Sequence, residues 1–215
     1  MKGFKYEKYR YIFPPRPKNA IPKTSIEDYS SKRFIGQPKL NGSNCTIYTD
    51  GVSYKVMNRH NQRLTRFNLT DEEILSLHRG KVGEWIAING EYMNKSKKDE
   101  SGDLFNHKFV IFDILVYEGK YLVGNSFQKR IELLDNLYGK ESSDNEHLYQ
   151  IEENIFRVKS YIGDLEDIFS KLIVTDMYEG LVIKRKSARL ELSKTETNNH
   201  QSQVKARKPT KNYRF

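Results

Sequence analysis

Cysteine is nearly absent from this chain, and Cys45 is the only one. A single thiol excludes an intrachain disulfide and indicates a reducing compartment. The five histidines and the one cysteine do not follow the spacing of a zinc site. No apolar run is long enough to span a bilayer or to form the core of a signal peptide. We therefore expect no membrane association and a cytoplasmic location.

Negative charge is scarce relative to positive charge. The chain has 37 Lys and Arg residues against 28 Asp and Glu residues, which gives a net charge of +9. This excess favours a polyanionic partner such as nucleic acid, although many basic proteins bind none. Aromatic residues make up 12% and charged residues 30% of the chain, which is typical of folded proteins. With 215 residues, we expect one sizeable core and a monomer.

Strand patterns outnumber helix patterns along the chain. A helix is predicted to begin at Thr70, where Glu73 completes a capping box, and two more are predicted over residues 126–139 and 163–173. Strands are predicted over residues 33–39, 44–48, 52–56, 83–93, 107–122, 154–162, 179–185 and 204–208, with a hairpin turn at Asp50-Gly51. Since no repeat or linker interrupts the pattern, the sequence predicts one α+β domain with antiparallel sheets flanked by helices.

The beginning of the chain differs from the rest in composition. Its Lys and Arg residues alternate with Tyr and Phe, and the stretch PPRP favours an extended backbone. We predict that residues 1–33 form a basic, aromatic arm packed on a domain of residues 34–215. Because grooves that bind nucleic-acid strands combine basic and aromatic side chains, the arm is a candidate strand-binding surface. Simple packing of the arm on the sheet is the equal alternative.

The stretch KLNGSN, residues 39–44, places a lysine between an apolar strand and a glycine turn. The strand would fix the direction of the Lys39 amine, and Gly42 would let the backbone approach a ligand closely. Neighbouring cations and burial would lower the pKa of Lys39 and make it nucleophilic. From composition alone, however, a lysine is far more often a surface charge than a nucleophile.

The residues that follow in the chain have the properties that such a lysine would need. They are Arg59, Glu91, Phe112, Glu179, Lys184, Lys205 and Arg207. A lysine that attacks the α-phosphorus of a nucleoside triphosphate requires cations for the phosphates, carboxylates for a metal or a ribose, and an aromatic ring for the base. Each residue by itself has an ordinary explanation, such as a solvated strand Glu or a core Phe. Together they predict a nucleotidyl-transfer site.

These motifs, in this order, resemble those of the covalent nucleotidyltransferase family that comprises ATP-dependent polynucleotide ligases and mRNA capping enzymes. KLNGSN resembles the lysine motif of this family, and NRH, NGEY, VIFDIL, EGLVIK and VKARK resemble its later motifs. The resemblance covers residues 34 to 208. It implies an ATP-grasp-like ligase domain that uses ATP and Mg²⁺ or Mn²⁺.

The resemblance also implies a role for each matching residue. Lys39 is expected to be the adenylated nucleophile, Gln37 to contact the adenine edge, and Phe112 to stack on the base. Arg59 is expected to contact the ribose or the phosphates, and Glu91 the ribose or a metal. Glu179 is expected to bind a metal. The phosphates are expected to be bound by Lys184, Lys205 and Arg207. The implied reaction has three steps, in which lysyl-AMP forms, AMP moves to a 5′-phosphate, and a 3′-hydroxyl displaces AMP.

Three features depart from the family pattern. Asn41 stands where the lysine motif usually has an acidic residue, and Arg207 stands where the last motif more often has Lys. Seven residues follow Lys208, so we expect a stand-alone catalytic domain with no oligonucleotide-binding barrel and no sixth motif.

The choice of polymer rests on few residues. Asn44, five residues after Lys39, is found in the phage-type RNA ligases that seal nicks, whereas DNA ligases and capping enzymes more often have Arg there; Arg59 also fits the RNA ligase branch. We predict an RNA ligase that seals 3′-OH and 5′-phosphate ends in nicked duplex RNA or an RNA-containing duplex, with Asn44 near the nucleic-acid end. A virus-encoded repair enzyme in the host cytoplasm would suit the small size. The alternatives are a minimal ATP-dependent DNA ligase and a non-catalytic nucleic-acid-binding domain of the same fold.

Overall fold

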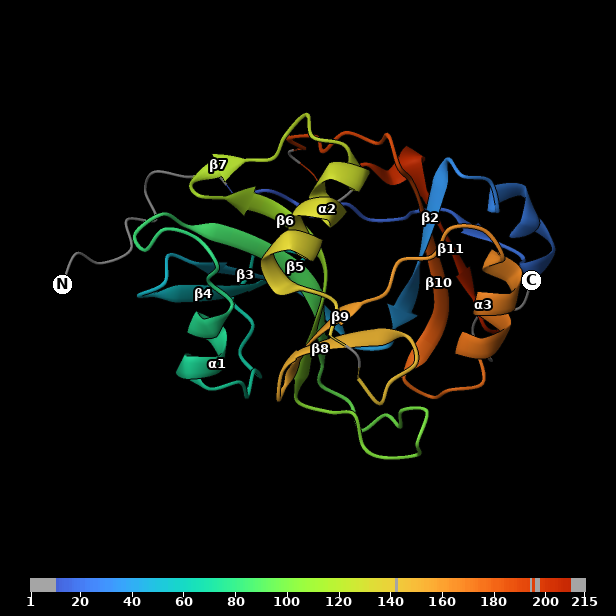
Figure 1. The fold of residues 1–215 in the computed structure, drawn as a ribbon, viewed down its shortest axis with the longest axis horizontal. Helices are drawn as coiled ribbons and strands as arrows, with labels where there is room; N and C mark the ends of the chain where they lie inside the picture. The colour runs from blue at the N-terminus through green and yellow to red at the C-terminus, as the bar shows by residue number, and fades with distance from the viewer. Residues whose placement is uncertain (1–10, 142, 194, 196–197, 210–215) are drawn as a thin grey trace.

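The computed structural model describes residues 11–141, 143–193, 195 and 198–209, and it shows two β-sheets side by side (Figure 1). The small sheet has the strand order β1-β11-β10-β2, and the large sheet has the order β4-β3-β5-β6-β9-β8, with β7 paired to β6. The strands are β1 (Ala20–Ile21), β2 (Phe34–Leu40), β3 (Ser43–Thr49), β4 (Tyr54–Asn58), β5 (Ile86–Met93), β6 (Lys108–Tyr117), β7 (Lys120–Tyr121), β8 (Leu148–Glu152), β9 (Ile155–Val158), β10 (Tyr178–Arg185) and β11 (Gln203–Arg207). The predicted α+β class is confirmed.

Strand pairing is mostly antiparallel, with two exceptions. Strand β1 runs parallel to β11, and β6 runs parallel to β9. The prediction of antiparallel sheets was therefore wrong for these two pairs. Parallel neighbours need a long connection, which the segment containing α2 and β8 provides between β6 and β9. The described residues form open sheets and no closed barrel.

Three α-helices flank the sheets: α1 (Asp71–Ser76), α2 (Phe127–Tyr138) and α3 (Leu165–Leu172). The predicted capping box is present, because Thr70 Oγ1 accepts a hydrogen bond from the Glu73 amide and the Glu73 carboxylate accepts one from the Thr70 amide. Helix α2 ends at Gly139, as predicted, with a left-handed φ of 65° there. Three short 3₁₀ helices, η2 (Lys23–Ser25), η3 (Glu27–Tyr29) and η4 (His200–Ser202), were not predicted.

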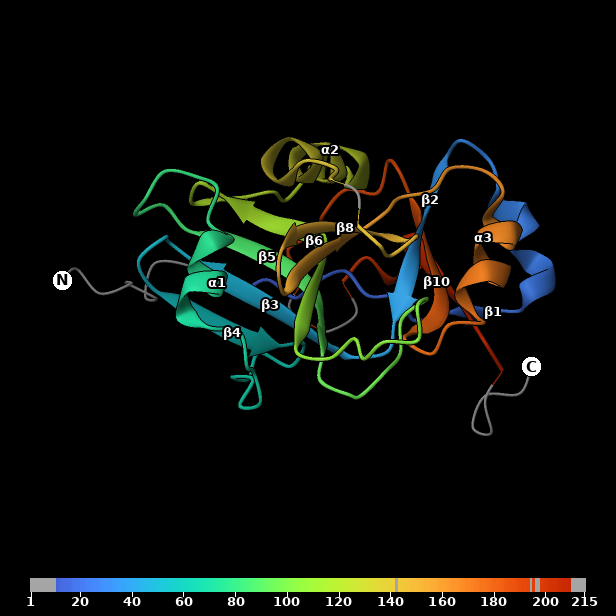
Figure 2. The same cartoon turned by 60° about the horizontal axis from the view of Figure 1, so that its bottom comes forward.

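The helices cover one face of each sheet, as Figure 2 shows for α2 over the large sheet and α3 beside β10. Ile47, Ile88 and Phe127 belong to the core between the large sheet and helices α1 and α2. A second core includes Leu181 of the small sheet and Phe169 of α3, and it also contains Val110 and Phe156 of the large sheet. This core therefore joins the two sheets.

The described part of the predicted arm runs against both sheets. Tyr11 and Ile12 are buried in a third apolar cluster with Tyr48 and Leu115 of the large sheet, and β1 adds to the edge of the small sheet. Residues 1–10 lie outside the described residues, and the division of the chain at residue 33 stays a prediction. Among the described residues, no helix has the length and apolar composition needed to cross a membrane.

Candidate active site

A cavity of about 490 Å³ opens between the two sheets. All ten residues that the sequence singles out line it, and these are Gln37, Lys39, Asn44, Arg59, Glu91, Phe112, Glu179, Lys184, Lys205 and Arg207. They come from six strands and one loop, separated by up to 170 positions in the chain. The structure therefore brings together the whole predicted set of residues. The volume of the cavity lies in the range of small-molecule sites.

Cross-strand pairing in the small sheet sets the order of the side chains on the cavity face. One row joins Lys39, Gly180 and Arg207, and the next row joins Gln37, Val182 and Lys205. Alternate residues of a strand share a face, so the residues of both rows that carry side chains line the cavity together. Two lysines and an arginine thus approach one another without being neighbours in the sequence.

A β-bulge brings Glu179 into the same row. The pairing of β10 with β2 shifts between Tyr178 and Gly180, so Glu179 is an extra residue beside the pair formed by Lys39 and Gly180. Gly180 has a φ of 138°, and a Cβ there would lie 2.2 Å from the carbonyl oxygen of Ala206. Only glycine permits this backbone, so Gly180 in the stretch EGLVIK has a structural reason.

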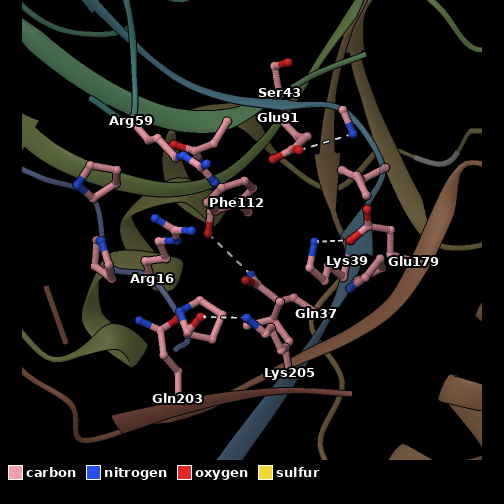
Figure 3. Close-up of a pocket in the computed structure, with 18 of the residues that line it drawn as sticks. Arg16, Gln37, Lys39, Ser43, Arg59, Glu91, Phe112, Glu179, Gln203 and Lys205 are labelled. Atoms are coloured by element: carbon pink, nitrogen blue, oxygen red, sulfur yellow. Dashed lines mark hydrogen bonds and ion pairs between the residues drawn. The ribbon is translucent and has the colours of Figure 1, made fainter. Parts of the chain in front are cut away.

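The amine end of the cavity, which we define as Lys39, Glu179 and Arg207, is a tight charge cluster; Figure 3 shows its contact between Lys39 and Glu179. Lys39 Nζ donates to Glu179 Oε2 at 2.5 Å, and Arg207 Nη2 lies 3.3 Å from the same oxygen. The side chains of Lys39 and Glu179 are only 18% and 28% exposed. A partly buried carboxylate shared by two cations fixes the position of the Lys39 amine.

Glu91 faces this cluster from the large sheet. The Gly42 amide donates to Glu91 Oε1 at 3.2 Å, and a Cβ at Gly42 would lie 2.4 Å from the carbonyl oxygen of Tyr92, so glycine is required for this approach. Burial raises the pKa of Glu91 to about 7, against the opposing effect of Lys39 and with a further increase from Glu179. The protonation state of Glu91 is therefore sensitive to pH near neutrality.

The aromatic end of the cavity, which we define as Gln37, Phe112 and Lys184, is deeper. Lys184 Nζ donates to Gln37 Oε1 at 2.8 Å and lies 5.0 Å from the centre of the Phe112 ring. The Gln37 amide nitrogen donates to Ser160 Oγ at 3.2 Å, which fixes the orientation of the amide. Burial lowers the pKa of Lys184 to about 8. This position, beside an amide and an aromatic ring, differs from the phosphate contact that the resemblance implied for Lys184.

Arg59 and Asn44 lie on the side of the large sheet. Arg59 follows β4, and its Nε donates to His60 Nε2 at 3.1 Å. Asn44 lies opposite Glu91 in the β3/β5 pair, and its amide nitrogen is 3.4 Å from the Gly90 carbonyl oxygen. In Figure 3 Arg59 and Glu91 come from neighbouring parts of the cavity wall.

Several cavity residues were not singled out from the sequence. Arg16 comes from the arm, and Gln203 is a buried residue of β11. Gln203 precedes Lys205 by two positions, so strand alternation alone is a signal that could have placed it in the cavity. Arg16 has no comparable signal, because its position depends on how the arm crosses the sheets.

The donor set is compatible with a nucleotide and its metal ion. The described residues contain no group of three or more His, Cys, Asp or Glu side chains that could hold a metal by themselves. Glu91 and Glu179 are the acidic side chains among the described residues that line the cavity. Mg²⁺ is commonly held by one or two carboxylates together with substrate phosphates and water, so two glutamates suffice when a nucleotide is bound.

Comparison with models of known protein families identifies the family of this chain. The model of the RNA ligase family matches residues 32–206, which include every cavity residue named above except Arg16 and Arg207. The chain belongs to the RNA ligase family. A search of curated protein sequences finds no match.

Solved structures similar to this RNA ligase family member include DNA ligases. A mycobacterial DNA ligase D complexed with ATP and MES is 16% identical, with a TM-score of 0.64, over 95% of this chain and 62% of that one. The ligase domain of M. tuberculosis LigD is 14% identical, with a TM-score of 0.59, over 94% of this chain and 60% of that one. A Lig E DNA ligase, described as binding DNA with a minimal scaffold, is 16% identical, with a TM-score of 0.55, over 90% of this chain and 68% of that one. At these identities the likeness shows the nucleotidyltransferase fold, and the chain spans about three fifths of the length of the LigD structures.

Proposed function

We propose that this protein is an ATP-dependent polynucleotide ligase that forms a lysyl-AMP intermediate on Lys39. The observation that carries the proposal is the amine end of the cavity, where Lys39 Nζ contacts Glu179 and Arg207 lies against the same carboxylate. The family match and the ATP-bound ligase D of similar fold support the choice of ATP. The reaction joins a 3′-hydroxyl to a 5′-phosphate end.

The two ends of the cavity suggest how ATP binds. Phe112 lines the cavity from the large sheet and Val182 from the small sheet, so a purine between them would contact both. Gln37 and Lys184 then reach the edge of the base, and we assign Lys184 to this edge rather than to the phosphates because its ammonium already donates to Gln37. Lys205 is left near the α-phosphate.

The ribose and the metal complete the proposed nucleotide site. Arg59, Glu91 and Glu179 all line the cavity. We assign Arg59 and Glu91 to the ribose hydroxyls, and Glu91 with Glu179 would hold Mg²⁺ or Mn²⁺. When bound, the metal neutralises phosphate charge and orients the leaving group. Lys205 and Arg207 supply further positive charge toward the α-phosphate from the protein itself.

The chemistry then follows from the position of Lys39. Its ammonium must lose a proton before attack, and Glu179 Oε2 is the oxygen in contact with it. The amine forms a bond to the α-phosphorus as the bond from that phosphorus to the bridging oxygen breaks, and pyrophosphate leaves with the electron pair. A 5′-phosphate oxygen of the nucleic acid next displaces Lys39 and takes the AMP. A 3′-hydroxyl finally attacks the activated 5′-phosphate, and AMP departs.

We favour a nicked RNA duplex, or a duplex containing RNA, as the substrate. Two observations support RNA as the substrate. They are the family match and Asn44, which lies opposite Glu91 near the beginning of β3. A DNA nick is the second candidate because similar solved structures include DNA ligases. The net charge of +9 suits either polymer.

Incubation with α-³²P-ATP and Mg²⁺ tests the first step. The wild-type protein should acquire an acid-labile AMP adduct, Lys39→Ala should acquire none, and Lys32→Ala should behave as wild type because Lys32 is exposed and outside the cavity. If the wild-type protein acquires no radioactive AMP adduct at any pH across a wide range, the result would instead favour a non-catalytic nucleic-acid-binding domain.

A second experiment decides the polymer. Purified lysyl-AMP protein is mixed with nicked duplexes of RNA, of DNA and of both hybrid types, and sealing is measured in a single turnover. Faster sealing of duplexes with RNA at the nick is the expected result. Equal or faster sealing of the all-DNA nick would identify a minimal DNA ligase.

A further inference from the structure

Part of the arm crosses the open side of the nucleotide cavity. We call this segment, residues 13–17, the strap. It begins beside Tyr11 and Ile12, which are buried against the large sheet, and it leads into β1 at the edge of the small sheet. Its residues Pro14 to Pro17 all line the cavity. The strap therefore connects the two sheets and forms one wall of the site.

Hydrogen bonds fix the strap to a distant part of the chain. Asn198 is buried, and its side-chain nitrogen donates to the Phe13 carbonyl oxygen at 2.6 Å and to the Glu191 carbonyl oxygen at 2.8 Å. The Asn198 carbonyl oxygen accepts from the Arg16 amide at 3.0 Å. Three prolines restrict the same backbone. The backbone of Arg16 is thus held on both sides.

The small sheet holds the end of the strap. Lys205 Nζ donates to the Pro17 carbonyl oxygen at 3.4 Å, and the Lys205 amide donates to the Asn19 carbonyl oxygen at 3.0 Å. These bonds connect a cavity lysine directly to the strap and to the residues that follow it. Burial lowers the pKa of Lys205, and the charges of Arg207, Lys39 and Arg16 lower it further, which places Arg16 in the same electrostatic environment.

Arg16 and Lys39 approach the cavity from opposite sides. In Figure 3 the guanidinium of Arg16 points into the cavity from the strap, while Lys39 enters from β2 across the space. In a displacement at phosphorus, the leaving group departs roughly in line with the attacking atom and away from it. For attack by Lys39, the in-line direction across the cavity leads toward the wall that carries Arg16.

We propose that Arg16 binds the pyrophosphate part of ATP and stabilises its negative charge as the bond to the α-phosphorus breaks. This inference rests on the proposed function, and it adds a residue from outside the matched family region. The planar guanidinium can donate two parallel hydrogen bonds to phosphate oxygens, which a lysine cannot reproduce. Because pyrophosphate takes part only in the first step, Arg16 acts on lysyl-AMP formation and not on sealing.

Arg16→Ala and Lys18→Ala form a matched pair of variants for the test. Both residues are exposed and belong to the arm, but Lys18 does not line the cavity. The rate of lysyl-AMP formation at low ATP should fall about 10- to 100-fold in Arg16→Ala, the range expected for loss of a charge-assisted hydrogen bond. Discharge of lysyl-AMP by added pyrophosphate should fall by a similar factor, and Arg16→Lys should recover part of both rates. Lys18→Ala should match wild type.

The sealing step distinguishes pyrophosphate binding by Arg16 from a purely structural role of this residue. Sealing of a nick that carries a chemically pre-adenylated 5′ end needs no ATP, so Arg16→Ala should seal it at the wild-type rate. Equal loss in this assay and in lysyl-AMP formation would overturn the inference in favour of a general effect of the strap. Unchanged lysyl-AMP formation in Arg16→Ala would overturn the inference alone. A wild-type protein that forms no lysyl-AMP would overturn the proposed function and this inference with it.

Discussion

The two ends of the cavity hold their charged groups in different ways. At the amine end, Lys39, Glu179 and Arg207 are partly exposed and neutralise one another through direct contacts. At the aromatic end, Lys184 is 7% exposed and is held by one neutral amide and two aromatic rings, and its pKa is lowered by burial. A charge cluster open to solvent can exchange its partners for phosphates, whereas a buried lysine fixed by Gln37 is suited to recognise one ligand edge.

The difference follows from the backbone around each end. The amine end depends on a bulge and a glycine with positive φ, which place Glu179 next to Lys39. The aromatic end depends on regular strand pairing, in which Gln37 and Lys184 lie on adjacent antiparallel strands in neighbouring rows. Backbone changes should therefore damage the amine end, and side-chain changes should alter the selectivity of the aromatic end.

The largest effect is expected for Gly180→Ala. The new Cβ would lie 2.2 Å from the Ala206 carbonyl oxygen at a φ of 138°, so the free energy of unfolding should fall by about 3 kcal/mol or more. Gly163→Ala is the matched control, because Gly163 also has a positive φ but no atom within 4 Å of an added Cβ. It should lose only about 1 kcal/mol. Urea unfolding measures both, and equal losses would show that the contact with Ala206 is unimportant.

Glu179→Gln should come next. The variant keeps the size of the side chain but removes the negative charge shared by Lys39 and Arg207 and the proposed metal ligand. We expect lysyl-AMP formation to slow by about 100-fold, mainly in kcat. Glu153→Gln, an exposed position outside the cavity, is the control. A wild-type rate in Glu179→Gln, measured at saturating ATP, would contradict the role of the cluster.

Lys184→Met should give a smaller and different effect. Methionine can fill the space between Phe112 and Phe127, but it cannot donate to Gln37 Oε1. The KM for ATP should rise by about tenfold, with a smaller change in kcat, and the preference for ATP over GTP should narrow. Lys129→Met on the exposed side of α2 is the control. A fall in kcat without a change in KM would place Lys184 at the phosphates, as the resemblance implied.

The smallest effect is expected for the stability of Glu91→Gln. The pKa of Glu91 in the folded protein, about 7, is above its ordinary value, so the folded state binds more protons than the unfolded state between about pH 5 and 7. Wild-type stability should therefore decrease as the pH rises through this window. Removing the charge should stabilise the variant by about 1 kcal/mol at pH 8, after allowance for partial exposure, and by less at pH 5. Thermal unfolding at both pH values measures this, and a pH-independent difference would contradict it.

Much of this fold could be predicted because its signals are local. The capping box at Thr70 and the glycine stop at Gly139 depend on residues a few positions apart. The strand carrying Lys39 and the following glycine turn were also readable, since an apolar strand, a polar turn and Gly42 follow one another directly. The order of the motifs predicted the set of residues that line the cavity, while their individual roles stay predictions.

Other features depend on contacts between distant segments. The parallel β1/β11 pair, the bulge at Glu179 and the hydrogen bond between Asn198 and Phe13, 185 positions apart, leave no periodic pattern in the sequence. The position of Lys184 beside Gln37 also has no local signal, because it results from the pairing of β10 with β2. This position is the reason why we assign Lys184 to the base and not to the phosphates.

The sequence was sufficient to predict which side chains line the cavity: one lysine near the end of a strand, two glutamates, an aromatic ring and a set of cations in a fixed order. Their arrangement into an amine end, an aromatic end and a wall carrying Arg16 required the folded chain. Residue type and local spacing determine what a group can do, but the pairing of strands across the sheets determines which groups meet, because those hydrogen bonds join residues that no local pattern relates.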